Sequence, residues 1–458
     1  MTNLEPFLPI SDAFDVLRAE HERDWLHLVY VQPQMVGRIG GDRSIVVVGG
    51  NGVGKTSARL WLARLGKLPP QRLVVDWILP QPEPREQSLQ TLDMLLADLL
   101  RACVRELVRV ICVDRQKHFA ASSWLLDSVV WLVARCTTGA HDLFFRQLRR
   151  SLAPEQTTLL DELLQDGDKG VSTFDASLSD ILSEFSSTTI ELGLRGTWVL
   201  LDGLEGWQDV ATDLLDEQVR ILLSTLSLFE TPGFAIKVFA PDTLENSLLE
   251  SGAVISRRID VVPLRWQSTE LQEIVERRLA RLMGVAAFSL GGLGDVEFLL
   301  DRLSTYGGER PLGWLQMLRP FVDDYMLNTA REPLSKDRCQ EVWRSHPPRL
   351  YIDSARQRVY LAFRDLGIEG GNMFRLMQYL YENRQRVCAW DELYYIGYRG
   401  YEYVASHPDD DRYEYPKNWK HTLEMAISRL RKAINCDPYN PPYLVTERQR
   451  GVRLQYVT

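Results

Sequence analysis

A short glycine-rich run constrains this chain more than any other feature of its sequence. Residues 49–56 read G-G-N-G-V-G-K-T and fit the pattern G-x-x-x-x-G-K-[ST] of a phosphate-binding loop. The apolar run at 44–48 predicts a buried strand before the loop, and residues 57–65 predict a helix after it. The alternative is a glycine-rich turn that binds nothing. The Lys-Thr pair and the two flanking elements favour the phosphate-binding loop, because backbone N–H groups at a helix N-terminus bind anions.

Each residue of this loop has an expected role. We expect Lys55 to reach the β- and γ-phosphates of a nucleoside triphosphate and the Thr56 hydroxyl to bind Mg²⁺. The other predicted nucleotide-binding residues of the loop are Gly49, Gly50, Asn51, Gly52, Val53, Gly54 and Ser57. The guanine-specific sequence N-K-x-D is absent from the chain, so we expect ATP with Mg²⁺.

A second motif of the same chemistry lies further along the chain. Residues 197–201 predict a buried strand that ends at Asp202. Such a strand can deliver its carboxylate to the sheet edge beside the loop, where the acid holds Mg²⁺. We therefore expect Asp202 to be a metal ligand and Glu205 to polarise the attacking water. For Glu205 the alternative is a solvated loop acid. Lys55, Asp202 and Glu205 are the predicted catalytic residues.

The order of apolar runs predicts an α/β fold. Strands are expected at 44–48, 72–78, 197–201 and 234–240, and they alternate with helices as in a doubly wound parallel sheet. Residues 86–190 predict a helical insertion within this core, which should span 41–262. We expect a lead-in at 1–40 with a helix at 13–23, and a helical lid domain at 263–345.

Four residues outside the two motifs are weaker candidates. Asp242 follows the last predicted strand, where a sensor of the γ-phosphate would lie, but an acid repels phosphate and a loop role is favoured. Arg257 and Arg258 are either solvated surface or contacts to the nucleotide of a neighbouring subunit. Arg310 begins a predicted helix at 312–326 and is the candidate sensor of the γ-phosphate.

These motifs together resemble the STAND branch of signal-transduction ATPases, which is related to the AAA+ ATPases. The resemblance runs from residue 33 to 326 and includes the loop at 49–56, D-G-L-E at 202–205 and G-E-R-P at 308–311. It implies that the state of the bound nucleotide determines whether the protein is an open monomer or a closed oligomer. The family often has a second acid where Gly206 stands and an arginine near Asp242, so the resemblance implies slow hydrolysis here.

Charge is divided unevenly along the chain. From Arg349 onward there are 17 Lys and Arg against 14 Asp and Glu, a net charge of +3. The whole chain has 53 against 62, a net of −9, so the part before Arg349 carries −12. A basic end on an acidic body favours two functions in two places.

The basic end has its own element pattern. Strands are expected at 350–353 and 358–361, helices at 374–381 and from 391, and a hairpin at 443–446 and 451–454. Residues 422–434 predict an amphipathic helix with a cationic outer face. The apolar face of this helix consists of Leu423, Ala426, Ile427, Leu430 and Ile434.

This pattern over 349–458 resembles the α+β winged helix-turn-helix domain of OmpR/PhoB-type response regulators. The resemblance implies that 417–434 is a recognition helix for the major groove of duplex DNA and that the hairpin is the wing. The DNA-binding residues it implies are Lys417, Lys420, His421, Arg429, Arg431, Lys432, Arg448, Arg450 and Arg453. Two alternatives stay open, a solvated helix and a winged helix that binds protein. Arg453 stands where the family's wing usually has glycine.

The leading hypothesis is an ATP-switched regulator in which a slow ATPase controls oligomerisation and DNA binding. The alternative is an ATPase subunit of an anti-phage or mobile-element system, and a third is a DNA remodeller. A protein partner is expected at 86–190 or at the loop 397–416. Scattered cysteines, the absence of a signal peptide pattern and the absence of a long apolar run predict a cytoplasmic protein without a membrane span.

Overall fold

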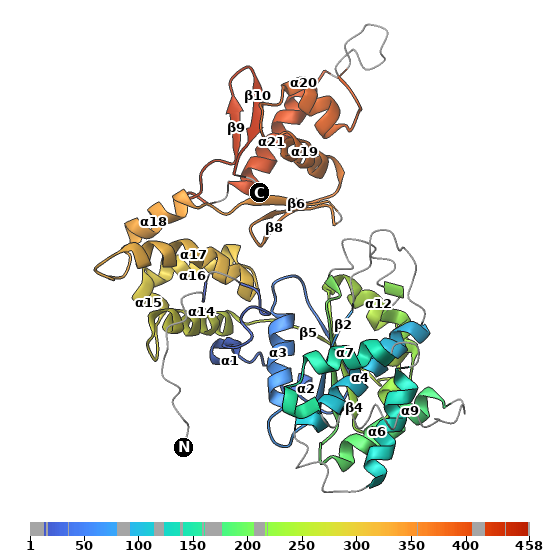
Figure 1. The fold of residues 1–458 in the computed structure, drawn as a ribbon. Coiled ribbons are helices and arrows are strands. Elements are labelled where there is room, and N and C mark those ends of the chain that lie inside the picture. Colours follow the sequence, from blue (N-terminus) through green and yellow to red (C-terminus); the bar gives the residue numbers. More distant parts are fainter. Residues whose placement is uncertain are drawn as a thin grey trace. The chain divides into compact units, whose positions relative to one another are not determined.

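The chain forms two compact units, shown in Figure 1. One is Arg18–Arg265, here called the P-loop unit; the other, the C-terminal unit, joins Trp266–Thr458 to residues at the start of the chain. This computed structural model describes residues 13–14, 17–34, 36–79, 92–113, 123–137, 141–157, 160, 176–205, 216–217, 219–354, 356–404, 417–435 and 437–456.

A five-stranded parallel sheet forms the centre of the P-loop unit. Its strands are β1 (Ile45–Val48), β2 (Leu73–Ile78), β3 (Thr197–Asp202), β4 (Phe234–Ala240) and β5 (Asp260–Pro263). They lie in the order β2-β3-β4-β1-β5, so β4 separates the strand before the loop from the strand that ends at Asp202. The predicted α/β fold with a parallel sheet is confirmed.

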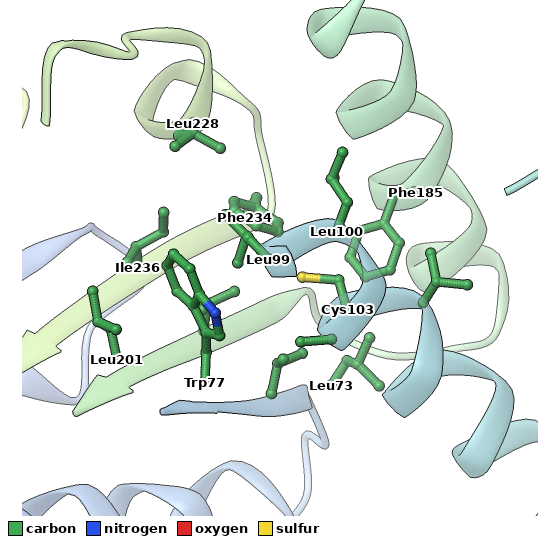
Figure 2. Packing of buried hydrophobic residues seen from close by; sticks show 14 of the residues in the cluster. Leu73, Trp77, Leu99, Leu100, Cys103, Phe185, Leu201, Leu228, Phe234 and Ile236 are labelled. Carbon is green, nitrogen blue, oxygen red and sulfur yellow. The ribbon is translucent and has the colours of Figure 1, made fainter. Parts of the chain in front are cut away.

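Helices cover both faces of this sheet, because alternate residues of each buried strand point to opposite sides. On one face α3 (Lys55–Gly66) packs Ala58 and Leu62 against Val47 and Leu200. The helices of the other face are α4 (Leu92–Val113), α6 (Ser123–Cys136), α7 (His141–Arg150) and α9 (Leu178–Glu191). Figure 2 shows Leu99, Cys103 and Phe185 of these helices against Trp77 and Ile236 of the sheet.

One prediction was wrong, and one strand of this unit was missed. The expected helix at 13–23 is absent from the described residues of that range, which form turns before α1 (Leu26–Val29). The strand β5 was missed because it is a short edge strand that ends in Pro263, and its only fully buried side chain is Val262. Short elements complete the unit: α2 (Val36–Ile39), η1 (Pro154–Gln156), α11 (Ser227–Glu230), η2 (Asp242–Leu244), α12 (Glu245–Leu249) and α13 (Gly252–Ile255).

The C-terminal unit begins with a run of helices. They are α14 (Ser268–Met283), α15 (Leu290–Leu293), α16 (Val296–Tyr306), α17 (Pro311–Leu327) and α18 (Lys336–Ser345). The carbonyl oxygen of Ala13 accepts a hydrogen bond from Arg278 of α14 at 2.8 Å, which ties the start of the chain to these helices.

The remaining residues, from Arg349 onward, are here called the C-terminal module. Its antiparallel sheet is β6 (Leu350–Asp353), β7 (Arg358–Leu361) and β8 (Arg364–Glu369). The helices are α19 (Gly371–Glu382), α20 (Trp390–Glu392) with its wider continuation η3 (Leu393–Tyr398), and α21 (Trp419–Ile434). The hairpin is β9 (Leu444–Glu447) and β10 (Gly451–Leu454), with Val452 bridged to Cys388.

Two corrections concern this module. β8 was missed because its sequence R-D-L-G-I-E has no alternation of apolar residues, and Gly367 interrupts it with a φ of 65°. The predicted helix at 417–434 begins two residues later, so Lys417 lies in the turn before α21 rather than on the helix. The acidic part of the expected partner loop, 405–416, lies outside the described residues.

A buried polar network joins the module to the helices before it. Asp437, between α21 and β9, accepts hydrogen bonds from Arg302 and, at 2.9 Å, from Tyr306, both on α16. Asn440 donates to the Tyr306 hydroxyl at 3.0 Å and accepts from Trp343 of α18 at 2.7 Å. The end of α21 is therefore anchored to α16 and α18.

Candidate functional site

The glycine-rich loop joins β1 to α3 in a backbone conformation that requires glycine. Gly52 and Gly54 have φ values of 78° and 93°, which residues with a Cβ rarely adopt, and Gly54 is the residue before the first turn of α3. A Cβ on Gly49 would lie 2.6 Å from Cγ2 of Val53. The N–H group of Gly49 is held by the Ala240 carbonyl of β4 at 3.1 Å. The sheet thus fixes a tight loop directly before a helix N-terminus.

This arrangement suits an anion. The N–H groups of Lys55, Thr56 and Ser57 lie in the first turn of α3, where a helix provides no acceptor for them. The helix dipole adds partial positive charge at the same end. The glycine conformations, the first turn of α3 and the adjacent lysine fit a chain of phosphates.

Lys55 and Glu205 lie together at this loop. The Lys55 side chain is 4% exposed, and its Nζ donates to the carbonyl oxygens of Gly49 at 2.5 Å and Gly50 at 3.1 Å. The same Nζ lies 2.9 Å from Oε1 of Glu205, whose side chain is 32% exposed. Two of the three predicted catalytic residues are therefore in direct contact.

Asp202 is held by an arginine that the sequence interpretation missed. Asp202 is 5% exposed; its Oδ2 accepts from Nε of Arg59 at 2.9 Å and its Oδ1 from the Gly203 N–H at 2.8 Å. Nη1 of Arg59 also donates to Asp76 of β2 at 2.7 Å. Arg59 is itself 4% exposed. Its position four residues after Lys55 places both side chains on the same face of α3, and this spacing is the signal that the sequence offered.

The other predicted residues of the P-loop unit are placed as follows. Thr56 is half-buried in the first turn of α3. Asp242 begins η2 directly after β4 and Pro241. Arg258 pairs with Glu230 at 2.9 Å and Arg257 is exposed with a φ of 58°. Gly206 lies outside the described residues.

Arg310 belongs to the C-terminal unit. It stands at the start of α17, and its guanidinium lies 5.9 Å from the centre of the Phe363 ring in the turn between β7 and β8. The candidate sensor therefore contacts the sheet of the C-terminal module within its own unit.

The candidate DNA-binding residues divide by exposure. The apolar face of α21, from Leu423 to Ile434, is buried in the module. Arg431 is half-buried and donates to Oγ1 of Thr446 on β9 at 2.6 Å. Arg453 is also half-buried. The exposed residues are Lys417, Lys420, His421, Arg429, Lys432, Arg448 and Arg450, of which Arg450 pairs with Glu447 at 3.1 Å.

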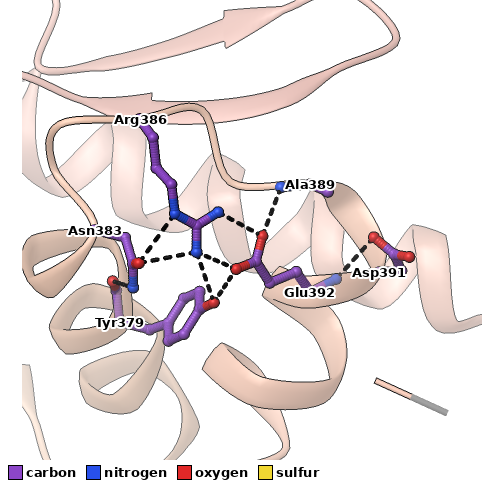
Figure 3. Close-up of polar contacts among 6 residues, drawn as sticks. All are labelled: Tyr379, Asn383, Arg386, Ala389, Asp391 and Glu392. Atoms are coloured by element: carbon purple, nitrogen blue, oxygen red, sulfur yellow. Dashed lines mark hydrogen bonds and ion pairs between the residues drawn. The ribbon is translucent and has the colours of Figure 1, made fainter. Parts of the chain in front are cut away.

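A polar network fixes the turn between α19 and α20, as Figure 3 shows. Arg386 donates to Glu392 at 2.8 Å and to Asn383 at 3.1 Å, and Tyr379 donates to the same carboxylate. Hydrogen bonds from Arg386 lower the pKa of Glu392 to about 2. Glu392 also accepts from the Ala389 N–H, which caps α20. The turn is therefore held by its own side chains.

No protein-family model and no curated protein matches the sequence. Among solved structures, the chain is similar to the Aeropyrum pernix ORC2 protein, determined in ADPNP–ADP complexes. The two share 13% sequence identity over 98% of this chain and 94% of that chain, with a TM-score of 0.36. At this identity and score the likeness carries no functional conclusion.

None of the helices in the described residues is sufficiently long and apolar to cross a membrane. No cluster of three or more His, Cys, Asp or Glu side chains in this part of the chain forms a metal site.

Proposed function

We propose that the chain is an ATP-binding switch that controls DNA binding through its C-terminal module. The observation that carries the proposal is the loop itself, with glycine-only backbone angles at Gly52 and Gly54 and Lys55 at the start of α3. The five-stranded parallel sheet around it is consistent with an AAA+-type P-loop domain. In this proposal the phosphates of ATP bind residues 49–57, and Thr56 and Asp202 supply oxygen ligands for Mg²⁺.

The charge contacts of the loop favour a slow switch over a motor. Lys55 is engaged by Glu205, and Asp202 is engaged by Arg59 and the Gly203 N–H. A bound phosphate chain would compete with Glu205 for Lys55, and Mg²⁺ would compete with Arg59 for Asp202. Both exchanges oppose the assembly of a hydrolytic site, so we infer nucleotide binding with slow hydrolysis, as in the STAND resemblance.

The C-terminal module supplies the proposed output. An exposed cationic helix, a hairpin bonded to it through Arg431 and Thr446, and an N-terminal antiparallel sheet support the winged-helix interpretation. Exposed arginines and lysines suit phosphate contacts, which dominate the affinity of proteins for DNA.

The Asp437 network ties the proposed output to helices of its own unit. Because α16 and α18 hold the end of α21 through buried hydrogen bonds, these helices and the recognition helix should move as one body. A nucleotide-dependent movement of the helices would then reposition the DNA-binding surface. We further propose that ATP binding promotes self-association, and that several copies on one DNA gain affinity by multivalency.

The test is duplex DNA binding by the full chain, with and without ATP and Mg²⁺, over a range of salt concentrations and alongside light-scattering mass. The proposal expects salt-sensitive DNA binding and an ATP-dependent mass. Lys55→Ala should remove the effect of ATP on DNA binding and on the mass. Lys67→Ala, at an exposed position at the end of the same helix, should preserve both effects. A folded protein without DNA affinity would contradict the output, and normal ATP binding by Lys55→Ala would contradict the nucleotide site.

A further inference from the structure

A positively charged pocket lies at the base of the C-terminal hairpin and includes one of the candidate DNA-binding residues, Arg453. Its volume is about 530 Å³. Three segments of the C-terminal unit line it: the end of α18 with His346 and Arg349, the turn after α19 with Arg384 and Gln385, and the end of β10 with Arg453 and the residues after it. All three segments belong to the same compact unit.

The lining of this pocket contains three arginines and no carboxylate. Three other hollows of the described residues mix the two charges. One in the P-loop unit, for example, places Arg105 and Arg109 beside Asp76 and Glu106. In that hollow the carboxylates of the lining can neutralise the arginines. The pocket at the hairpin has no carboxylate in its lining to do so. Walls of one charge concentrate the field and attract ions of opposite charge.

Arg453 contributes a second, independent observation. Its Nε is fully enclosed and has no hydrogen-bond acceptor among the described residues. Val452 and Leu454, its neighbours on β10, are buried, so Arg453 projects to the opposite face of the strand, and Arg453 and Leu454 both border the pocket. Because Nε is enclosed, an oxyanion in the pocket would be bound by the outer N–H groups of the Arg453 guanidinium, whose side chain is half-buried.

The arginine of the α19 turn is fixed in place. Arg384 donates to the Tyr381 carbonyl at 3.1 Å and lies 4.9 Å from the centre of the Tyr381 ring. Arg386, two residues further, is engaged by Glu392, Tyr379 and Asn383 (Figure 3). Glu392 is thus already bound by Arg386, and Arg384 forms no ion pair with a carboxylate among the described residues.

We propose that this pocket binds a phosphate group, presented either by a small polyphosphate compound or by the backbone of DNA. Guanidinium groups match the oxygens of phosphate in pairs and stay charged at all physiological pH values. Three of them around one hollow favour a multiply charged oxyanion over a single carboxylate. The volume suits a small phosphorylated molecule. The site is independent of the P-loop, and only its DNA form rests on the proposed function.

The test uses the full chain carrying Lys55→Ala, so that the P-loop does not contribute. Pyrophosphate is titrated by calorimetry into this protein and into the same protein with Arg349→Gln or Arg453→Gln. The control is Arg344→Gln, an exposed α18 arginine outside the pocket lining. We expect pyrophosphate to bind, and each pocket variant to bind about tenfold more weakly, the effect of one lost charged contact. Because Arg349 is exposed, its variant should keep the fold.

A second arm separates the two phosphate sources. The same proteins are titrated with duplex DNA at several salt concentrations. If pyrophosphate does not bind, but both pocket variants bind DNA more weakly and with a smaller salt dependence, then the pocket binds a phosphate of the DNA backbone. If both pocket variants match Arg344→Gln with pyrophosphate and with DNA, the proposal is wrong.

Discussion

The cations of the P-loop site and those of helix α21 have opposite surroundings. At the P-loop, Lys55 and Arg59 are each 4% exposed and each contacts a carboxylate within 2.9 Å. On α21, Lys420, Arg429 and Lys432 are exposed and form no ion pair with a described carboxylate. One set of charges is enclosed and paired, and the other is solvated and open.

This difference predicts how each region responds to mutation. Removing one partner of a buried pair leaves a charge without compensation, which costs about 3–5 kcal/mol. Removing a solvated cation changes the stability little and acts only on a bound polyanion. If burial causes the larger loss of stability, then removing the partner of any buried charge should be costly in either unit.

The largest effect is expected for Arg59→Met. The substitution leaves Asp202 buried without its cation, so the free energy of unfolding of the P-loop unit should fall by about 4 kcal/mol, measured by urea unfolding of the full chain. The matched control is Arg258→Met, whose ion pair with Glu230 is exposed and should contribute no more than about 1 kcal/mol. Similar losses in the two variants would show that burial does not distinguish these pairs.

Asp437→Asn carries the same comparison into the C-terminal unit. Asp437 is 7% exposed and accepts from Arg302 and Tyr306, so the amide should reduce the stability of that unit by about 3 kcal/mol. ATP binding, measured by calorimetry, should be unchanged because the P-loop unit is untouched. The control is Asp353→Asn, on a half-buried residue paired loosely with Arg356 at 3.9 Å. An equal loss in both would contradict the role of the network.

The sequence specified the elements whose signal is local. The loop at 49–56 lies where its pattern required, and the strands β1, β2, β3 and β4 were predicted to within a residue or two because apolar β-branched runs are unmistakable. β5 and β8 were missed because strands with proline, glycine or several charges lack periodicity.

Contacts between distant residues were the part that the sequence did not reveal. Lys55 is 150 positions from Glu205, and only the sheet order brings them together. The Arg59 bridge between Asp76 and Asp202 depends on β2 and β3 lying side by side, which no local pattern specifies. The role of a residue can be inferred from the spacing within its motif, but the contacts between distant residues depend on the order of the strands in the sheet.

A moderate, pH-dependent effect is expected at Lys237, which is fully buried in β4. Its Nζ donates to the carbonyls of Gly41 at 2.7 Å and Arg43 at 2.5 Å, and burial lowers its pKa to about 7. Between pH 7 and the ordinary lysine pKa, the unfolded chain holds a proton that the folded chain has released. Lys237 therefore adds a contribution to stability that increases with pH in this window.

Lys237→Met should remove this contribution. From pH 7 to pH 9 the wild type should gain about 2 kcal/mol of stability relative to the variant, measured by urea unfolding at each pH. Buried thiols such as Cys103, whose pKa is raised by burial, act in the opposite direction but equally in both proteins. A constant difference between the two proteins would mean that Lys237 stays charged in the fold.

The smallest effects are expected on α21, where two neighbouring arginines divide the two roles. Arg429 is exposed, so Arg429→Gln should change the stability by less than about 0.5 kcal/mol and lower the salt dependence of DNA binding by about one phosphate contact. Arg431 holds the hairpin through Thr446, so Arg431→Gln should cost about 1 kcal/mol of stability because it loses that bond. If only Arg429→Gln lowers the salt dependence of DNA binding, then Arg429 contacts a DNA phosphate and Arg431 serves the fold through its bond to Thr446. Identical results would mean that the bond to Thr446 contributes nothing and that exposure alone does not mark the DNA-binding face.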